Sequence, residues 1–100
     1  MKNKGPRQRL TLGEYEAEIR RTLSYDPETG TFTYKVRCGN YRSGHRPGFV
    51  LNGYPYIAVR QMPIIATRIA WFLMTGKWPA RRIKLRDGEP TNLSWENLRP

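Results

Sequence analysis

The sequence predicts a small α+β domain with two main helices, near residues 12–23 and 66–75, around short antiparallel β-hairpins. Both helical segments are amphipathic and carry helix-end signals. Residues 31–36 and 54–60 alternate side chains in the manner of half-buried strands. With 100 residues and 38% hydrophobic content, the chain is long enough to form one modest core.

The N-terminal residues are basic and contain no apolar face. They carry Lys2, Lys4, Arg7 and Arg9. We expect a flexible basic arm over residues 1–10 and a folded domain over residues 11–100. The arm lacks the apolar stretch of a signal peptide, and the chain has no apolar run long enough to span a bilayer.

The first helix is predicted from its start signal and its charge pattern. Thr11 fits an N-cap, and Glu14 follows three residues later as in a capping box. Acidic residues lie in the early turns and basic residues near the end, which suits the helix dipole. A turn signal at Asp26–Gly30 then leads into the strand predicted at Thr31–Val36.

The middle of the chain predicts a loop followed by a hairpin. Residues 37–48 form a basic, glycine-rich connection that we do not expect to pack into a core. Asn52-Gly53 is a strong two-residue turn signal between Phe49–Leu51 and Tyr54–Arg60. Pro55 lacks an N–H, which favours an edge or a bulge for its strand. A second turn is expected at Gln61–Pro63.

The second helix, Ala66–Thr75, has the clearest boundaries. Gly76 occupies the position of a terminating glycine, and Pro79 prevents the helix from resuming. We expect Trp71 and Trp78 to be packing residues. After the helix, the sequence predicts a short strand over residues 80–85, a turn at Asp87-Gly88 and a loop to Arg99. Three loop side chains are expected to pack back: Leu93, Trp95 and Leu98.

The charge balance is the most unusual property of the composition. The chain has 18 Lys and Arg against 8 Asp and Glu, a formal net charge of +10 and a pI near 10.4. Such a balance favours a polyanionic partner, most commonly nucleic acid. An acidic protein surface, or solubility alone, would also account for it. The single cysteine, Cys38, excludes an intrachain disulfide and any CxxC pair, and we expect a reducing, cytoplasmic compartment.

Four segments of the chain carry a recognisable pattern in a fixed order. They are Tyr25-Asp26-Pro27-Glu28-Thr29-Gly30-Thr31-Phe32-Thr33-Tyr34, Ala66-Thr67-Arg68-Ile69-Ala70-Trp71, Gly76-Lys77-Trp78-Pro79 and Ile83-Lys84-Leu85-Arg86-Asp87-Gly88 followed by Glu96-Asn97-Leu98-Arg99. Over about residues 23–99, this pattern resembles the phage HNH endonucleases, including the homing type. The resemblance implies a phage origin and a C-terminal ββα-like unit.

The residues that would perform cleavage are absent. The family's Asp-His pair falls on Lys84 and Leu85, and the histidine of its helix falls on Thr67. A metal-dependent nuclease needs a hard oxygen ligand and a base, which neither Lys84 nor Leu85 supplies. Asn97 remains at a metal-binding position, and the chain stops where the family's last helix would begin. We therefore expect no enzyme activity and no metal or other cofactor.

Two basic groups are the candidate nucleic-acid-binding residues. The first, called the ridge below, follows the second helix and comprises Lys77, Arg81, Arg82, Lys84 and Arg86. The second precedes and spans the glycine-rich connection and comprises Lys35, Arg37, Arg42 and Arg46. The resemblance implies that the ridge contacts the phosphodiester, where Lys84 would stand in for the lost cation. Arg68 ranks below the ridge, since the resemblance implies a structural role for it.

Two functions from different classes remain open. The first is a non-catalytic nucleic-acid-binding protein, with duplex DNA as its partner. The alternative is a small phage protein that binds and inhibits a host protein. A continuous basic face would favour DNA, whereas a compact apolar patch around Tyr41, Phe49, Tyr54 and Tyr56 would favour a protein partner. A residual nuclease ranks third, and His45 is expected to be a surface residue.

Overall fold

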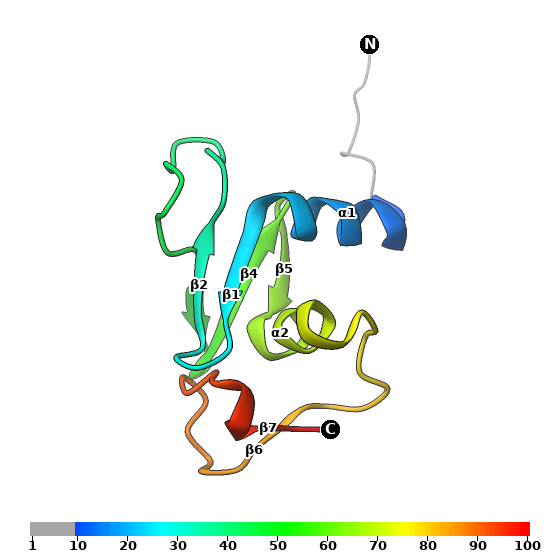
Figure 1. Ribbon diagram of the computed structural model, residues 1–100, viewed down its shortest axis with the longest axis vertical. Coiled ribbons are helices and arrows are strands. Elements are labelled where there is room, and N and C mark those ends of the chain that lie inside the picture. Colours follow the sequence, from blue (N-terminus) through cyan, green and yellow to red (C-terminus); the bar gives the residue numbers. More distant parts are fainter. Residues whose placement is uncertain (1–9) are drawn as a thin grey trace.

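The computed structural model describes residues 10–100, which form two helices and three small antiparallel sheets (Figure 1). The predicted small α+β fold is therefore confirmed. Residues 1–9 of the predicted basic arm lie outside the described residues. Within the described part, no helix combines the length and the apolar character needed to cross a bilayer.

The first helix, α1 (Leu12–Thr22), begins as predicted. The Glu14 N–H donates to Thr11 Oγ1 at 3.2 Å, and the Thr11 N–H donates to Glu14 Oε1 at 2.8 Å, which completes the capping box. The helix ends one residue before the predicted end, because Leu23 adopts an extended backbone (φ −114°, ψ 137°) and begins strand β1.

Strand β1 (Leu23–Asp26) was not predicted, because four residues directly after a helix show no separate periodicity. It pairs antiparallel with β2 (Thr31–Tyr34), with Leu23 opposite Tyr34 and Asp26 opposite Thr31. The predicted strand Thr31–Val36 is two residues too long. It ends where the Lys35 N–H turns to donate to the Thr22 carbonyl at 2.7 Å.

The glycine-rich connection, residues 37–48, contains a tight turn between Cys38 and Tyr41. The Tyr34 N–H donates to the His45 carbonyl at 2.9 Å, and Cys38 pairs with Tyr41 by two backbone hydrogen bonds. The rings of Tyr34, Tyr41 and His45 stack on one another, with Tyr41 and His45 only 4.6 Å apart between ring centroids. The segment thus packs against itself and not into the core. His45 is exposed, as expected.

The second sheet contains β3 (Phe49–Leu51), β4 (Tyr54–Val59) and β5 (Met62–Ile65), with β4 in the centre. The expectation that Pro55 places its strand at an edge is wrong. Pro55 is tolerated because β5 pairs with β4 only from Tyr56 onward, so Pro55 faces β3 alone. Asn52-Gly53 forms the predicted turn, with φ values of 53° and 84°.

The turn expected at Gln61–Pro63 lies earlier than predicted. Arg60 and Gln61 occupy it with φ values of 50° and 72°. Met62 and Pro63 already belong to β5, where they pair with Val59 and Ala58. The sequence did not show where this turn begins, because neither Arg nor Gln is a usual residue for a positive φ.

Helix α2 (Ala66–Thr75) follows β5 without a connecting loop and ends as predicted. Gly76 has a φ of 79°, and its N–H donates to the Phe72 carbonyl at 2.8 Å. Both tryptophans pack as expected. Trp78 stacks on Phe72 at 4.6 Å between ring centroids, and Trp71 lies 4.9 Å from Trp95.

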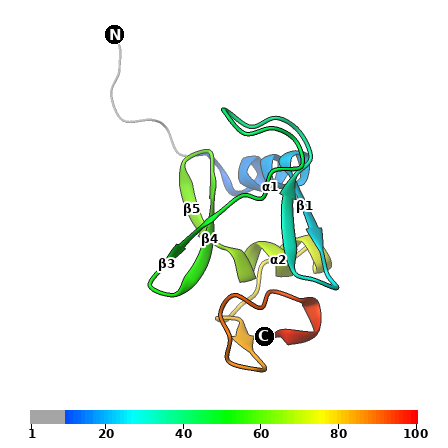
Figure 2. The same ribbon diagram turned by 90° about the vertical axis from the view of Figure 1, so that its left-hand side faces the viewer.

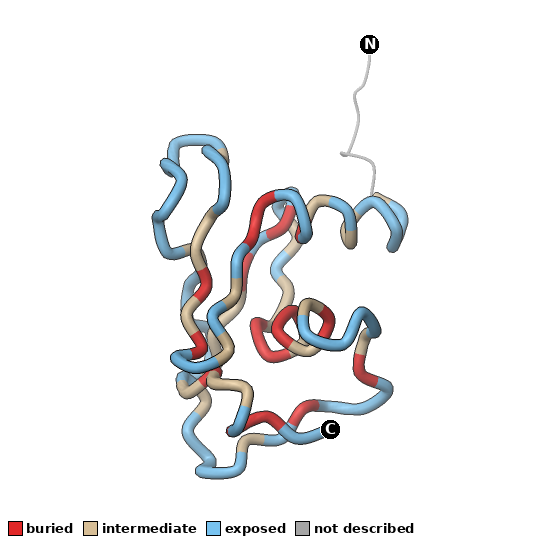
Figure 3. Tube along the Cα trace, viewed as in Figure 1, coloured by how far each residue is buried: buried red, intermediate tan, exposed pale blue. Residues whose placement is uncertain are grey.

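The hydrophobic core lies between α2, the end of α1 and the inner faces of the strands, as the buried segments in Figure 3 show. The described core side chains come from both ends of the chain: Ile19, Leu23, Phe32, Ile57, Val59, Ala66, Ile69, Ala70, Phe72, Ile83, Leu93 and Leu98. The N-terminal and C-terminal halves therefore share one core.

The C-terminal segment differs most from the prediction. Of the strand expected over residues 80–85, only β6 (Lys84–Leu85) forms. The loop expected over residues 89–99 contains a single 3-10 turn, η1 (Trp95–Asn97), and strand β7 (Leu98–Arg99), which pairs with β6. Strands of two residues are too short to be read from an alternating pattern.

The C-terminal segment is held against the β1–β2 turn, and both views show the two together (Figures 1 and 2). Tyr25 Oη donates to the Leu93 carbonyl, and the Trp95 N–H donates to the Pro27 carbonyl at 2.8 Å. Burial raises the pKa of Tyr25 to about 12, which fits a phenol that stays protonated in this contact. At Gly30, a Cβ would lie 2.4 Å from the Leu93 carbonyl carbon. Only glycine allows this approach.

This contact predicts different effects of one substitution at two glycines. Gly30 and Gly39 both have positive φ, 76° and 57°, but nothing lies within 4 Å of a Cβ at Gly39. We expect Gly39→Ala to lower the free energy of unfolding by about 1 kcal/mol, because of the backbone alone. Gly30→Ala should lower the free energy of unfolding by at least twice as much, because its Cβ would also meet the Leu93 backbone. Unfolding in denaturant measures both losses. Equal losses would show that the approach to Leu93 is unimportant.

Candidate functional site

A groove of about 650 Å³ lies between β4, the beginning of α2 and the β6 segment. Its volume is in the range of small-ligand sites, about 300–1,000 Å³. The lining residues come from three separate parts of the chain: Tyr54, Pro55, Tyr56, Ile65, Thr67, Arg68, Arg82, Ile83, Lys84, Leu85, Gly88 and Pro90. We call it the basic groove.

The local structure explains why these side chains meet. Tyr54 and Tyr56 are two residues apart on β4 and therefore lie on the same face of the sheet, opposite the buried Ile57. Ile65 pairs with Tyr56 and ends β5, so α2 begins at this edge of the groove. Thr67 and Arg68 occupy the first turn of α2.

The groove carries positive charge without internal compensation. Its lining contains Arg68, Arg82 and Lys84, and no Asp or Glu. Among the described residues the one ion pair is Glu18–Arg21, which lies outside this lining. In addition, no side chain caps the N-terminus of α2, and its first turn contains no acidic residue. A helix N-terminus carries partial positive charge, so this end of α2 adds to the same field.

Arg82 and Tyr54 contact each other across the groove. The Arg82 guanidinium carbon lies 5.7 Å from the centroid of the Tyr54 ring, within the range of a cation–π interaction. Arg82 itself is exposed, and Tyr54 is half-buried. The contact holds a flat cationic group at the opening of the groove.

Thr67 is a buried residue of the groove lining, and its hydroxyl has no hydrogen-bond partner within residues 10–100. The Thr67 residue is 6% exposed and lines the groove. By contrast, the hydroxyls of Thr22 and Thr75 donate to the carbonyls of Glu18 and Trp71 one helical turn earlier. Because Thr67 lines the groove and its hydroxyl makes no hydrogen bond within the described residues, this hydroxyl is available to a group that enters the groove.

The groove contains the three residues that the sequence resemblance aligns with catalytic positions. Thr67, Lys84 and Leu85 all line it. Asn97 does not, and its amide makes three hydrogen bonds elsewhere. Asn97 Nδ2 donates to Asp87 Oδ1 at 2.9 Å and to the Asn92 carbonyl at 2.8 Å, and Asn97 Oδ1 accepts the Asp87 N–H at 2.9 Å. This amide braces the Asp87-Gly88 turn.

Asp87 is the acidic partner of this brace. Hydrogen bonds from the Asn92 side chain, the Glu89 N–H and Asn97 lower the pKa of its carboxyl below the usual range. Because they favour the charged form, any stability gained from this shift is present above the ordinary pKa and is lost as the pH falls through the lowered value. Residues 10–100 contain no group of three or more His, Cys, Asp or Glu placed to hold a metal.

The remaining predicted binding residues are not in the groove. Lys77 and Arg81 are exposed outside its lining, and Arg86 lies beside Asp87 and Glu96 in a shallow depression. Of the second basic group, Lys35 donates from Nζ to the Arg20 carbonyl at 2.9 Å, and Arg42 is exposed. Arg46 lines an adjoining cavity that shares Pro55 and Tyr56 with the groove.

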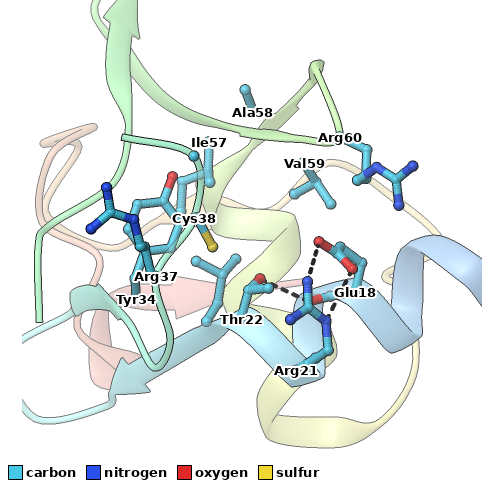
Figure 4. A pocket seen from close by; sticks show the side chains of 12 residues that line it. Glu18, Arg21, Thr22, Tyr34, Arg37, Cys38, Ile57, Ala58, Val59 and Arg60 are labelled. Atoms are coloured by element: carbon cyan, nitrogen blue, oxygen red, sulfur yellow. Dashed lines mark hydrogen bonds and ion pairs between the residues drawn. The ribbon is translucent and has the colours of Figure 1, made fainter. Parts of the chain in front are cut away.

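Arg37 lines a smaller cavity of about 250 Å³ between the end of α1 and β4 (Figure 4). Cys38 lies in the same cavity. Two hydrogen bonds join Arg21 to Glu18, the shorter of them 2.9 Å, and Arg37 points away from this pair. Since an acid already neutralises one of its cations, this cavity attracts an anion less strongly than the basic groove.

The aromatic residues divide into two groups. Phe49 stacks on Tyr56 at 6.0 Å between ring centroids, on the face that also carries Tyr54. Tyr41 belongs instead to the stack with Tyr34 and His45. Of the four residues expected to form an apolar patch, Phe49, Tyr54 and Tyr56 lie on this face of the sheet, whereas Tyr41 stacks with Tyr34 and His45.

Of the predicted binding residues, Arg82 and Lys84 line the groove, whereas the sequence assigned Tyr54 and Tyr56 only to a possible protein-binding patch and gave Thr67 no binding role. The alternation along β4 already places both tyrosines on one face, whereas only the fold places that face beside the β6 segment. Comparison with known proteins adds nothing to this geometry. No protein-family model matched the chain, and no match was found among curated proteins or solved structures.

The unpartnered hydroxyl predicts that Thr67→Val stabilises the protein. Valine keeps the shape of threonine and removes the buried polar atom, so the free energy of unfolding should rise by about 1 kcal/mol. Thr22→Val is the matched control, because the buried Thr22 hydroxyl donates to the Glu18 carbonyl at 2.7 Å. That variant should lose stability in the same denaturant titration. A loss at Thr67 as large as that at Thr22 would contradict the assignment.

Proposed function

We propose that this chain is a non-catalytic nucleic-acid-binding protein that binds duplex DNA at the basic groove. One observation carries the proposal: Arg68, Arg82 and Lys84 line the same groove with no acidic residue among them. Phosphate groups at regular spacing are the polyanion that such a site fits. The net charge of +10 would add long-range attraction.

The same groove argues against cleavage. At the position where the resemblance requires a metal-binding carboxylate, Lys84 repels a divalent cation, and Leu85 cannot accept a proton. The Asn97 amide is already engaged with Asp87 and Asn92. The groove thus offers phosphate binding without a base. A phage protein of this kind would act in the host cytoplasm or nucleoid.

The alternative function, binding and inhibition of a host protein, has its own supporting observation. Strand β3 is a sheet edge on which Phe49, Val50 and Leu51 are 45%, 61% and 48% exposed. Contiguous apolar residues on an edge strand are typical of surfaces that pair with another chain. This surface lies beside the basic groove, with which it shares the Phe49–Tyr56 stack.

The proposal predicts that the two ridge cations inside the groove contribute more to DNA binding than two ridge cations outside it. Arg82→Ala with Lys84→Ala removes two groove cations. Arg81→Ala with Arg86→Ala removes the same charge from exposed neighbours outside the groove lining. In a mobility-shift titration across a salt series, the groove pair should flatten the slope of log K against log salt by about two units.

The control pair should leave most of the slope intact. If both pairs change affinity and slope equally, the whole ridge contacts phosphate and the groove has no special role. If the intact protein binds no nucleic acid at low salt and instead retains a host protein in a pull-down, the inhibitor function replaces this proposal.

The proposal also predicts that the protein does not nick DNA. Supercoiled plasmid incubated with stoichiometric protein and Mg²⁺, Mn²⁺ or Zn²⁺ should remain supercoiled, because the groove contains no base and no carboxylate ligand. Gel electrophoresis measures the outcome. Nicking that requires a metal and is abolished by Asn97→Ala, in a variant that still binds DNA, would establish a residual nuclease.

A further inference from the structure

We propose that the basic groove takes a single unpaired nucleotide, with its base inside the groove and its phosphate at the cationic opening. This inference rests on the proposed function and deepens it, because it names the form of nucleic acid that the groove prefers. A duplex that contains a bulged or extruded base is the expected ligand. Three features of the groove support it.

The first feature is an apolar interior. Ile65, Ile83 and Leu85 line the groove together with Pro55 and Pro90. A surface that only follows phosphates needs exposed cations and no apolar hollow. A groove of about 650 Å³ with apolar walls can instead enclose the flat, weakly hydrated face of a base.

The second feature is the set of flat side chains. Tyr54 and Tyr56 lie on one face of β4, and the Arg82 guanidinium is held 5.7 Å from the Tyr54 ring centroid. Unpaired bases stack on aromatic rings and on guanidinium planes in proteins that bind single strands. The contact with Tyr54 orders Arg82 before a ligand arrives, which reduces the entropy lost on binding.

The third feature is the Thr67 hydroxyl. It belongs to a buried residue of the groove lining and lacks a hydrogen-bond partner within residues 10–100. A hydroxyl both donates and accepts, so it can hydrogen-bond an edge of any of the bases. Lys84 supplies charge for the attached phosphate, and Arg68, whose guanidinium lies 5.9 Å from the Trp78 ring centroid, adds positive charge nearby. Together these groups match a nucleotide better than a bare anion.

A base inside an intact duplex cannot reach such a site, because it is paired and stacked. Extrusion costs free energy, and this cost is smallest for a base that has no partner. The groove should therefore distinguish a duplex with one unpaired nucleotide from the same duplex fully paired. The distinction should come from the base and not from the backbone.

Three labelled duplexes test this inference by fluorescence anisotropy at fixed salt. One is fully paired, one carries a single bulged nucleotide, and one carries a bulged abasic residue in the same place. The intact protein should bind the bulged duplex about 5-fold to 150-fold more tightly than the paired duplex, which is the range that base stacking supplies. The abasic bulge should bind with nearly the affinity of the paired duplex.

Variants then locate the preference in the groove. Tyr54→Ala and Thr67→Val should each lower the ratio of the affinity for the bulged duplex to the affinity for the paired duplex. Tyr41→Ala is the matched control, because Tyr41 is an exposed tyrosine in the separate stack with Tyr34 and His45. That variant should keep the full preference. Thr67→Val is expected to fold, which guards against loss of binding by unfolding.

The outcomes separate this inference from the proposed function. Equal binding of all three duplexes would leave DNA binding in place and overturn the inference. Equal preference for the bulge and its abasic counterpart would also overturn it, since flexibility of the backbone would then explain the result. If no duplex binds at low salt, the proposed function fails and the inference fails with it.

Discussion

The contact between the β1–β2 turn and the Leu93–Trp95 segment determines the position of the C-terminal part of the protein. Tyr25, Pro27 and Gly30 hold Leu93 and Trp95 by hydrogen bonds and close backbone packing. Strand β7 follows Trp95 within a few residues and pairs with β6, so the same contact fixes the β6 segment. One wall of the basic groove, the β6 segment, therefore depends on a turn that lies far from it along the chain.

The charge of the groove and the Thr67 hydroxyl support the proposed ligand, because the core of the fold does not need them. The core already contains buried side chains from α1, the strands, α2 and the C-terminal segment. Arg68, Arg82 and Lys84 gain no ion pair within residues 10–100, and the Thr67 hydroxyl gains no hydrogen bond there. Clustered cations repel one another, and a buried unpaired hydroxyl is unfavourable. A nucleotide would offset both costs.

Asn97 belongs to the sequence pattern that resembles a nuclease motif, but its contacts in this fold are structural. Its three hydrogen bonds join it to Asp87 and Asn92 and hold the Asp87-Gly88 turn. Lys84 and Leu85, which line the groove, are chemically unsuited to cleavage. We propose that the groove instead binds a phosphate.

The sequence alone determined the elements whose signals are local. The capping box of α1, the Asn52-Gly53 turn and the Gly76 end of α2 each depend on a few adjacent residues, and all three were predicted correctly. Strand β1 and the β6–β7 pair were missed, because strands of two to four residues show no alternation of their own, and the turn at Arg60-Gln61 was predicted too late in the chain. Arg82 and Lys84 were named from charge alone, whereas only tertiary packing placed them in one groove with Tyr54, Tyr56 and Thr67, by bringing β4 and α2 beside β6.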